Sequence, residues 1–285
     1  MYRTTHPSGQ EHAVQTPTAT RTAGGEDRRD TQKRYRTQAV LWAIGLIVFA
    51  ISCFTIHFHP TPYPIDLWAT HSAQAEQPHL AGWLQFLIAL PSIVNDPVPS
   101  ALTLAAWVVM MLVVGLVRHL RKLPSLEWFL AAVGLAVAVM SSAAVNVLLD
   151  IIIGRPRPDP HHYHFQLHTP LVPFPTYPSG HTEHDVVYYG FLLYLSFTKP
   201  VREWKYHWLL LPLQIYAVFD IIDISYSRIY EGDHWLTDVL GGYLEGVLLL
   251  FFFIFLYRFT TNWFAKRRQR KEDAKTAGVY VAHTR

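Results

Sequence analysis

The sequence predicts an all-α, polytopic membrane protein with six transmembrane helices, and three observations support that fold class. The chain is 51% hydrophobic but only 16% charged, whereas soluble domains carry about 25% charged residues. Six apolar segments each approach the ~20 residues that an α-helix needs to cross a bilayer. Almost all lysines and arginines lie at the two ends and in alternate connections between those segments. These features disfavour an ordinary soluble domain.

The six predicted spans follow the apolar runs of the sequence. We place them at residues 38–58, 100–117, 128–153, 184–198, 207–225 and 236–258. The fourth is short and rich in tyrosine. The fifth carries Asp220 and Asp223, which should face the bundle interior or the interface because carboxylates are costly in lipid. A further apolar stretch at 81–90 is too short to span, and it fits either an interfacial amphipathic helix or a cap packed on the bundle.

Polar segments flank the apolar part of the chain. Residues 1–36 are rich in Thr, Gly, Gln and Arg and contain few large apolar side chains, so we expect a disordered cytoplasmic tail. Residues 37–260 should form the membrane domain, and residues 261–285 a second, basic cytoplasmic tail. The single cysteine, Cys53, lies inside an apolar run, so no intramolecular disulfide is possible.

The basic residues orient the spans. Of 24 lysines and arginines, all but three lie in the N-terminal tail, the connections 118–127 and 199–206, and the C-terminal end. By the positive-inside rule, both termini and these two connections are cytoplasmic. The three exceptions are Arg155, Arg157 and Arg228. Arginines placed against this bias need another reason to be there, and binding an anion supplies one.

The first of three polar clusters on the extracytoplasmic side follows the third span. It is residues 154–158, Gly-Arg-Pro-Arg-Pro. The prolines stop the helix and stiffen its exit, so Arg155 and Arg157 are presented on a rigid backbone. The alternative, a basic membrane anchor, belongs on the other side of the membrane.

The second cluster, residues 178–181, reads Pro-Ser-Gly-His directly before the fourth span. Ser179 suits an N-cap, and Gly180 lets backbone N–H groups approach a ligand closely. Because a helix N-terminus attracts anions, His181 would stand beside a bound anion, placed to give a proton. The alternative is an ordinary helix cap with a surface histidine.

The third cluster is residues 227–238, which contain Arg228, His234 and Asp238. If a helix begins there, His234 and Asp238 share one face because they are four residues apart. The carboxylate could then accept the Nδ1–H of the imidazole, which frees Nε2 to act as a base or a nucleophile. With an arginine close by, this arrangement indicates chemistry on a phosphate.

Together the clusters resemble the signature of the type 2 phosphatidic acid phosphatase superfamily, which spans lipid phosphatases, some soluble acid phosphatases and vanadium haloperoxidases. That signature runs Lys, six residues, Arg-Pro; then Pro-Ser-Gly-His; then Ser-Arg, five residues, His, three residues, Asp. The second and third parts match here residue for residue, and Arg157-Pro158 matches the end of the first. The resemblance covers about residues 100–258.

This resemblance implies an integral-membrane, metal-independent lipid phosphatase with no cofactor and an extracytoplasmic active site. It implies that His234 Nε2 attacks phosphorus and forms a phosphohistidine, that Asp238 orients His234, and that His181 protonates the leaving oxygen. The residues that it assigns to phosphate binding are Arg157 and Arg228, with Arg155, Ser179 and Gly180.

One position departs from the signature, because Asp150 stands where the family has its Lys. The change removes a phosphate-binding cation and adds an anion, unless the carboxylate pairs with Arg155 or Arg157 or its helix turns it away. A carboxylate beside phosphate is unfavourable at low effective dielectric. Asp150 is therefore a candidate modulator of substrate affinity.

Several alternatives stay open at this point. The substrate could be a polyprenyl diphosphate such as undecaprenyl diphosphate, phosphatidic acid or phosphatidylglycerol phosphate. The chain could instead be a lipid phosphotransferase, or a non-catalytic lipid-binding or transport relative. Four histidines in the loop 161–168 fit a polar lid or a zinc site. The expected partners are the lipid substrate and the bilayer, with no nucleic acid, and the oligomeric state stays open.

Overall fold

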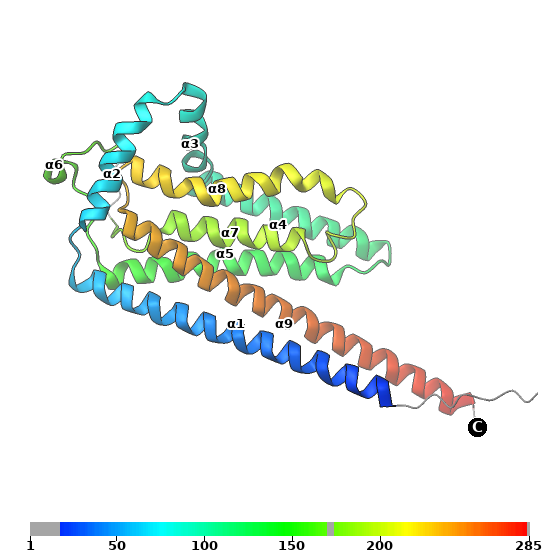
Figure 1. Cartoon of the computed structure of the whole chain (residues 1–285). Helices are drawn as coiled ribbons and strands as arrows, with labels where there is room; N and C mark the ends of the chain where they lie inside the picture. Colours follow the sequence, from blue (N-terminus) through cyan, green and yellow to red (C-terminus); the bar gives the residue numbers. More distant parts are fainter. Residues whose placement is uncertain (1–17, 170–173, 284–285) are drawn as a thin grey trace, which may run out of the picture. The chain divides into compact units, whose positions relative to one another are not determined.

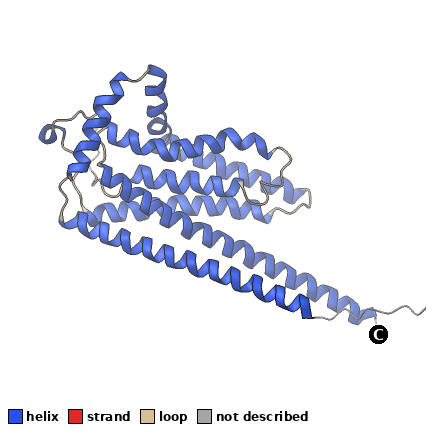
Figure 2. Ribbon diagram, in the orientation of Figure 1, coloured by secondary structure: helices blue, strands red, loops and turns tan. Residues whose placement is uncertain are grey.

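The computed structural model describes residues 18–169 and 174–283, which form helices and loops without a strand in those ranges (Figures 1 and 2). The all-α prediction is confirmed for this part of the chain. Within it, five helical segments are long and apolar enough to cross a membrane. They are Gln32–Phe58, Pro97–Leu120, Leu126–Ile153, His207–Tyr230 and Leu236–Ala274.

The fourth predicted span corresponds to α7 (Gly180–Ser196), the central helix of the bundle. It packs against α5 (Leu126–Ile153), α8 (Leu211–Tyr230) and α9 (Leu236–His283). α7 has only 17 residues, which is about 26 Å of helix. Nine of its side chains are buried, so its tyrosines contact other helices rather than lipid, which explains the weaker apolar signal in the sequence.

The outer faces of the long helices carry many exposed large apolar side chains. Examples from α4 (Pro97–Leu120), α5, α8 and α9 are Leu102, Leu116, Met140, Ile151, Ile222 and Phe251. In water such faces would aggregate, whereas in a bilayer lipid tails cover them. The distribution of apolar side chains therefore fits an integral membrane protein.

Glycines on α9 allow it to approach α7 and the loop before α7. A Cβ atom on Gly242 would lie 2.5 Å from the carbonyl oxygen of Ser179, and one on Gly246 would lie 2.8 Å from Val186 Cβ. Larger residues would force the helices apart. This close packing brings the Pro-Ser-Gly-His segment beside the start of α9.

Two short helices cover the end of the bundle where α7 and α9 begin. α2 (Pro64–Glu76) packs against α8 and α9, and α3 (Gly82–Val94) packs mainly against α8. In Figure 1 both lie at the same end of the molecule as the N-termini of α7 and α9. The stretch 81–90 therefore packs on the bundle, as the cap interpretation expects, while the 68% exposed Trp83 leaves an apolar surface for the interfacial alternative.

The first helix, α1 (Thr18–Phe58), begins inside the segment expected to be disordered. Residues 1–17 of that segment lie outside the described residues. No proline occurs between residues 18 and 59, and Arg, Lys, Gln and Ala favour helix. The helix therefore runs from the polar segment into the apolar run without a break. The chain up to Gly45 forms a unit of its own.

Candidate active site

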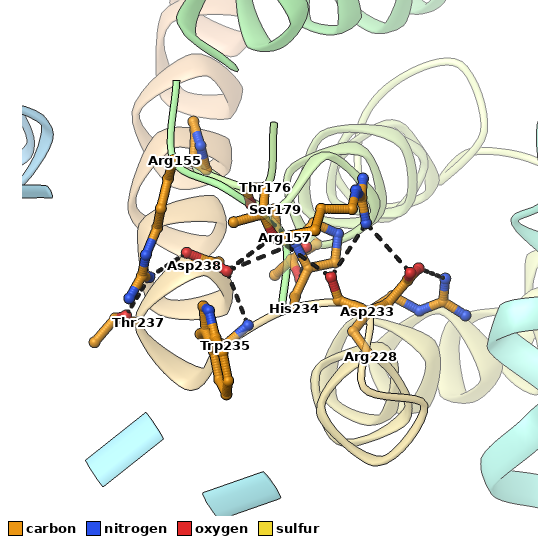
Figure 3. A network of polar contacts seen from close by, with 12 residues as sticks. Arg155, Arg157, Thr176, Ser179, Arg228, Asp233, His234, Trp235, Thr237 and Asp238 are labelled. Atoms are coloured by element: carbon orange, nitrogen blue, oxygen red, sulfur yellow. Dashed lines mark hydrogen bonds and ion pairs between the residues drawn. The ribbon is translucent and has the colours of Figure 1, made fainter. Parts of the chain in front are cut away.

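The structure brings all three motif clusters together at one end of the bundle (Figure 3). The backbone N–H of Ser179 donates to the carbonyl of Asp238, at 3.0 Å. This bond ties the second motif to the third. Arg157 from the first motif donates to Asp233 beside His234. Residues of the three clusters are therefore linked by hydrogen bonds.

The imidazole of His234 is buried and held by the main chain. It lies in the turn between α8 and α9, where Gly232 adopts a φ of +75°, and a Cβ there would collide with Phe165. His234 Nδ1 lies 2.9 Å from the carbonyl oxygen of Thr176. Because a carbonyl can only accept, Nδ1 carries the proton and Nε2 keeps a free lone pair. This is the tautomer that a nucleophile needs.

Electrostatics keep His234 in that neutral form. Burial, together with the cationic Arg157 and Arg228 near the ring, holds the pKa of His234 well below its usual value of 6.5. The imidazole is therefore unprotonated at Nε2 at neutral pH. Protonation would add a buried cation next to two others.

Asp238 lies farther from His234 than the sequence suggests. Its Oδ2 is 3.9 Å from His234 Nδ1, which is too long for a hydrogen bond. Oδ2 instead accepts from the backbone N–H of Trp235 at 2.8 Å and from the Thr176 hydroxyl at 3.0 Å. The reason is that α9 begins only at Leu236, so Asp238 bends back to cap the helix. It reaches the imidazole through Thr176.

Arg155 has a different position from the one predicted. Its guanidinium is fully buried and donates to Asp238 Oδ1, to the Thr237 hydroxyl, to Asp66 Oδ2 and to the carbonyl of Pro60. No exposed part of this side chain is left for a phosphate. The geometry therefore assigns Arg155 to holding Asp238 in place rather than to the phosphate contact expected from the motif.

Asp66 completes this buried cluster and could not be found from the sequence. It lies on α2, in a connection without a motif, and is fully buried. Its carboxylate accepts from the backbone N–H of Thr237 at 2.8 Å and from Arg155 at 3.0 Å. A carboxylate at a helix N-terminus stabilises the helix dipole. α2 thereby fixes the start of α9, where Asp238 lies.

Arg157 and Arg228 remain near the histidines. The Arg157 side chain is 14% exposed, and it donates to the carbonyl of Phe174 and to the carbonyl and carboxylate of Asp233. Its guanidinium is the most accessible of the three motif arginines. It is therefore well placed to meet an anion that enters the site.

The guanidinium of Arg228 is almost completely buried. One terminal nitrogen donates to Ser92 and pairs with Glu231. The other lies 3.3 Å from Asp233 Oδ2 and 3.5 Å from His181 Nε2. Its Nε is buried without a hydrogen-bond partner. Ser92 comes from α3, and no sequence signal marks it as part of the site.

His181 occupies the first turn of α7. The ring centroids of His181 and His234 are 6.3 Å apart. Ser179 is fully buried and its hydroxyl accepts from Thr182. Gly180 packs so closely on Asn146 that a Cβ would lie 2.7 Å from its side-chain oxygen. Ser179 stands at the N-cap position of α7, but its side chain makes no capping hydrogen bond.

Asp150 pairs with neither Arg155 nor Arg157 among the described residues. Its Oδ1 is buried without a hydrogen-bond partner. Arg157 and Asp238 are its main electrostatic neighbours. The carboxylate is thus close enough to the site to influence its charge.

The histidine-rich loop packs over the site. Tyr163 and Phe165 contact the buried ring of Trp235, and His168 stacks on Tyr230. Throughout residues 18–169 and 174–283, no three His, Cys, Asp or Glu side chains gather in a way that could hold a metal ion. These contacts favour the interpretation of the loop as a cover.

Comparisons with known proteins agree with this geometry. Residues 131–264 match the model of the PAP2 superfamily. Among solved structures, the chain is similar to a transmembrane PAP2-type phosphatidylglycerolphosphate phosphatase from Bacillus subtilis. The two share 20% sequence identity, with a TM-score of 0.57 over 75% of this chain and 94% of the other. At this low sequence identity, the match shows only that the two proteins share a fold. A comparison with curated proteins finds no match.

Proposed function

Since residues 131–264 belong to the PAP2 superfamily, we propose that this membrane protein hydrolyses a phosphomonoester or diphosphate of a lipid. One observation carries the proposal. His234 has its Nδ1 proton held by the Thr176 carbonyl, so its Nε2 is free. Two guanidiniums and a second imidazole lie next to it. These are the groups that phosphoryl transfer without a metal requires.

In the proposed mechanism, His234 Nε2 attacks phosphorus in line as the bond to the leaving oxygen breaks. His181 takes up a proton as the phosphate dianion binds and gives that proton to the leaving oxygen, and a phosphohistidine forms. His181 then takes a proton from water, which attacks the phosphohistidine and releases inorganic phosphate. Arg157 and Arg228 neutralise the charge on the equatorial oxygens. Asp238 acts through the Thr176 hydroxyl and Arg155 rather than by direct contact.

The Ser179 hydroxyl and the Gly180 N–H complete the proposed phosphate cradle. They stand at the start of α7, where backbone N–H groups and the helix dipole favour an anion. The position of His181 one residue later supports this assignment. A headgroup bound here would face both imidazoles.

We further propose that α7 crosses the membrane as a sixth span. Its length of about 26 Å approaches the ~30 Å hydrocarbon core. The distribution of lysines and arginines supports cytoplasmic tails at both ends of the domain, and an extracytoplasmic site in the plasma or inner membrane. A lipid would then reach the site by lateral diffusion, with its headgroup at this depth and its tail in the bilayer.

Three substrates fit this placement: a polyprenyl diphosphate such as undecaprenyl diphosphate, phosphatidic acid and phosphatidylglycerol phosphate. The similar solved structure is described as a phosphatidylglycerolphosphate phosphatase, which makes that lipid a natural first substrate to assay. A phosphotransferase would use the same groups but pass phosphate to a lipid acceptor. Product analysis with and without an added acceptor separates the two reactions.

The test is phosphate release by the purified full-length protein across a panel of these lipids. We expect activity to persist in EDTA, because arginines supply the positive charge. We expect orthovanadate to inhibit, because it adopts the five-coordinate geometry of the transferring phosphorus. Activity that EDTA removes and zinc restores would contradict metal independence. Absence of release from every lipid would favour the non-catalytic alternative.

Replacing Asp150 by Lys should raise affinity for the phosphate group. The change substitutes a cation for a carboxylate near Arg157, and we expect KM to fall by about 5-fold. Asp150→Asn separates loss of the anion from gain of the cation, so it should show a smaller decrease. An unchanged or higher KM in both variants would mean that Asp150 has a structural role of its own.

A further inference from the structure

Asp233 bridges the two arginines that face the catalytic histidines. Its Oδ1 accepts from Arg157 Nη1 at 3.2 Å, and its Oδ2 accepts from Arg228 Nη1 at 3.3 Å. The Asp233 side chain is 5% exposed and directly precedes His234 in the chain. Figure 3 shows it between the two guanidiniums. A single carboxylate therefore occupies the region where two cations converge.

These contacts are long for ion pairs. Charge-assisted N–H···O bonds are typically 2.7–2.9 Å, and both Asp233 contacts exceed that range. Arg228 Nε is also a buried donor without a partner. An oxyanion with more charge and more oxygens than a carboxylate could shorten these bonds and offer that donor an acceptor.

The charges around the two arginines lead to the same conclusion. Arg157 and Arg228 face two carboxylates, those of Asp233 and Glu231. The two cations are therefore already neutralised before any ligand arrives. An incoming phosphate dianion gains full attraction only if one carboxylate releases its guanidiniums. Asp233 is the one that contacts both.

We propose that Asp233 is a positioning residue that occupies the phosphate's place between Arg157 and Arg228, and that it yields both guanidiniums when the phosphate group binds. Before phosphate binds, it keeps the arginines aligned beside His234. After turnover it competes with inorganic phosphate for them and so speeds product release. The signature leaves the five positions between Arg228 and His234 unspecified, so it assigns no role to Asp233. The inference rests on the proposed function only in taking phosphate as the ligand.

The test compares phosphate affinity of the full-length protein and of Asp233→Asn. The amide keeps the shape of the side chain but lacks its charge. We expect the dissociation constants for orthovanadate and inorganic phosphate to fall about 10-fold. If the lipid is hydrolysed, KM should fall as well, and kcat should fall because the product leaves more slowly. Calorimetric titration measures the binding without any turnover, so it remains informative even if no lipid is hydrolysed.

Two variants serve as matched controls. Glu231→Gln removes an equal charge from Arg228, but Glu231 does not contact Arg157, so affinity should rise by less than about 3-fold. Glu203→Gln removes a carboxylate from an exposed pair with Lys199 and should leave affinity unchanged. Equal effects of Asp233→Asn and Glu231→Gln would indicate a general charge effect and overturn the proposal.

Weaker or unchanged anion binding by a folded Asp233→Asn protein would also overturn it, because Asp233 would then only support the arginines. If that variant does not fold, Thr169→Val provides the test. The Thr169 hydroxyl donates to Asp233 Oδ1 at 3.1 Å, so its loss loosens the carboxylate. Anion affinity should rise about 2-fold; a decrease would contradict displacement of Asp233.

Discussion

His234→Ala should abolish phosphate release while the protein still inserts and folds. Removing a covalent nucleophile costs rate enhancements on the order of 10⁴-fold or more, because the remaining groups cannot form the intermediate. The measurement is release of inorganic phosphate from the best lipid substrate of the panel. Retention of full activity would exclude His234 as the nucleophile.

The control for this experiment is His161→Ala. His161 lies in the histidine-rich loop, residues 161–168, and its side chain is exposed. Its loss should leave activity unchanged. Thermal unfolding of both variants in detergent separates a chemical defect from a folding defect. A phosphohistidine is hydrolysed in acid but is stable in alkali. With a substrate labelled in its phosphate group, alkaline quenching of the wild-type reaction should therefore leave label on the protein, and acid quenching should not.

Arg155→Met should strongly destabilise the protein, by about 3–5 kcal/mol. The substitution leaves Asp66 and Asp238 buried without their cation, and both side chains are fully buried in the structure. The N-terminus of α9 would then lose the contacts that fix it beside His234. Thermal unfolding of the detergent-purified protein, followed by circular dichroism, measures the loss.

The comparison with Arg157→Met makes this prediction specific. The Arg157 side chain is partly exposed, so its loss should lower activity with little effect on stability. Arg155→Met should show the opposite pattern, in which the loss of stability is the larger effect. If Arg155→Met unfolds like the wild type and shows only a raised KM, Arg155 is the phosphate ligand that the motif suggests.

The helices and the main cations could be predicted from the sequence because their signals are local. Apolar runs mark the long helices, and Arg157 and Arg228 stand out against the topological bias of the other basic residues. The histidines follow from their spacing to serine and aspartate. Each of these signals lies within a dozen residues of chain.

The supporting contacts could not be predicted because they join distant segments. Thr176, Asp66 and Ser92 belong to connections without a motif, and only the folded bundle brings them to the site. Whether Asp238 contacts His234 depends on the residue at which α9 begins. A start two residues earlier would put His234 and Asp238 on one helical face, whereas the observed start turns the carboxylate toward the Trp235 N–H.

α7 shows why composition misjudges a central helix. Its apolar signal is weak because its tyrosines and acidic residues pack against neighbouring helices instead of lipid. Asp185, for example, accepts a hydrogen bond from Asn95 inside the bundle. A central helix of this kind is recognised by the helices that surround it, and those neighbours cannot be read from its own sequence.

The bond between the Thr176 carbonyl and His234 has a consequence for how the protein tolerates mutation. The acceptor that selects the imidazole tautomer is part of the backbone, so no codon change at position 176 deletes it. A side-chain replacement there would remove only the hydroxyl that joins the ring to Asp238. The orientation of the His234 imidazole thus depends on the path of the chain at Thr176 more than on the side chain at that position.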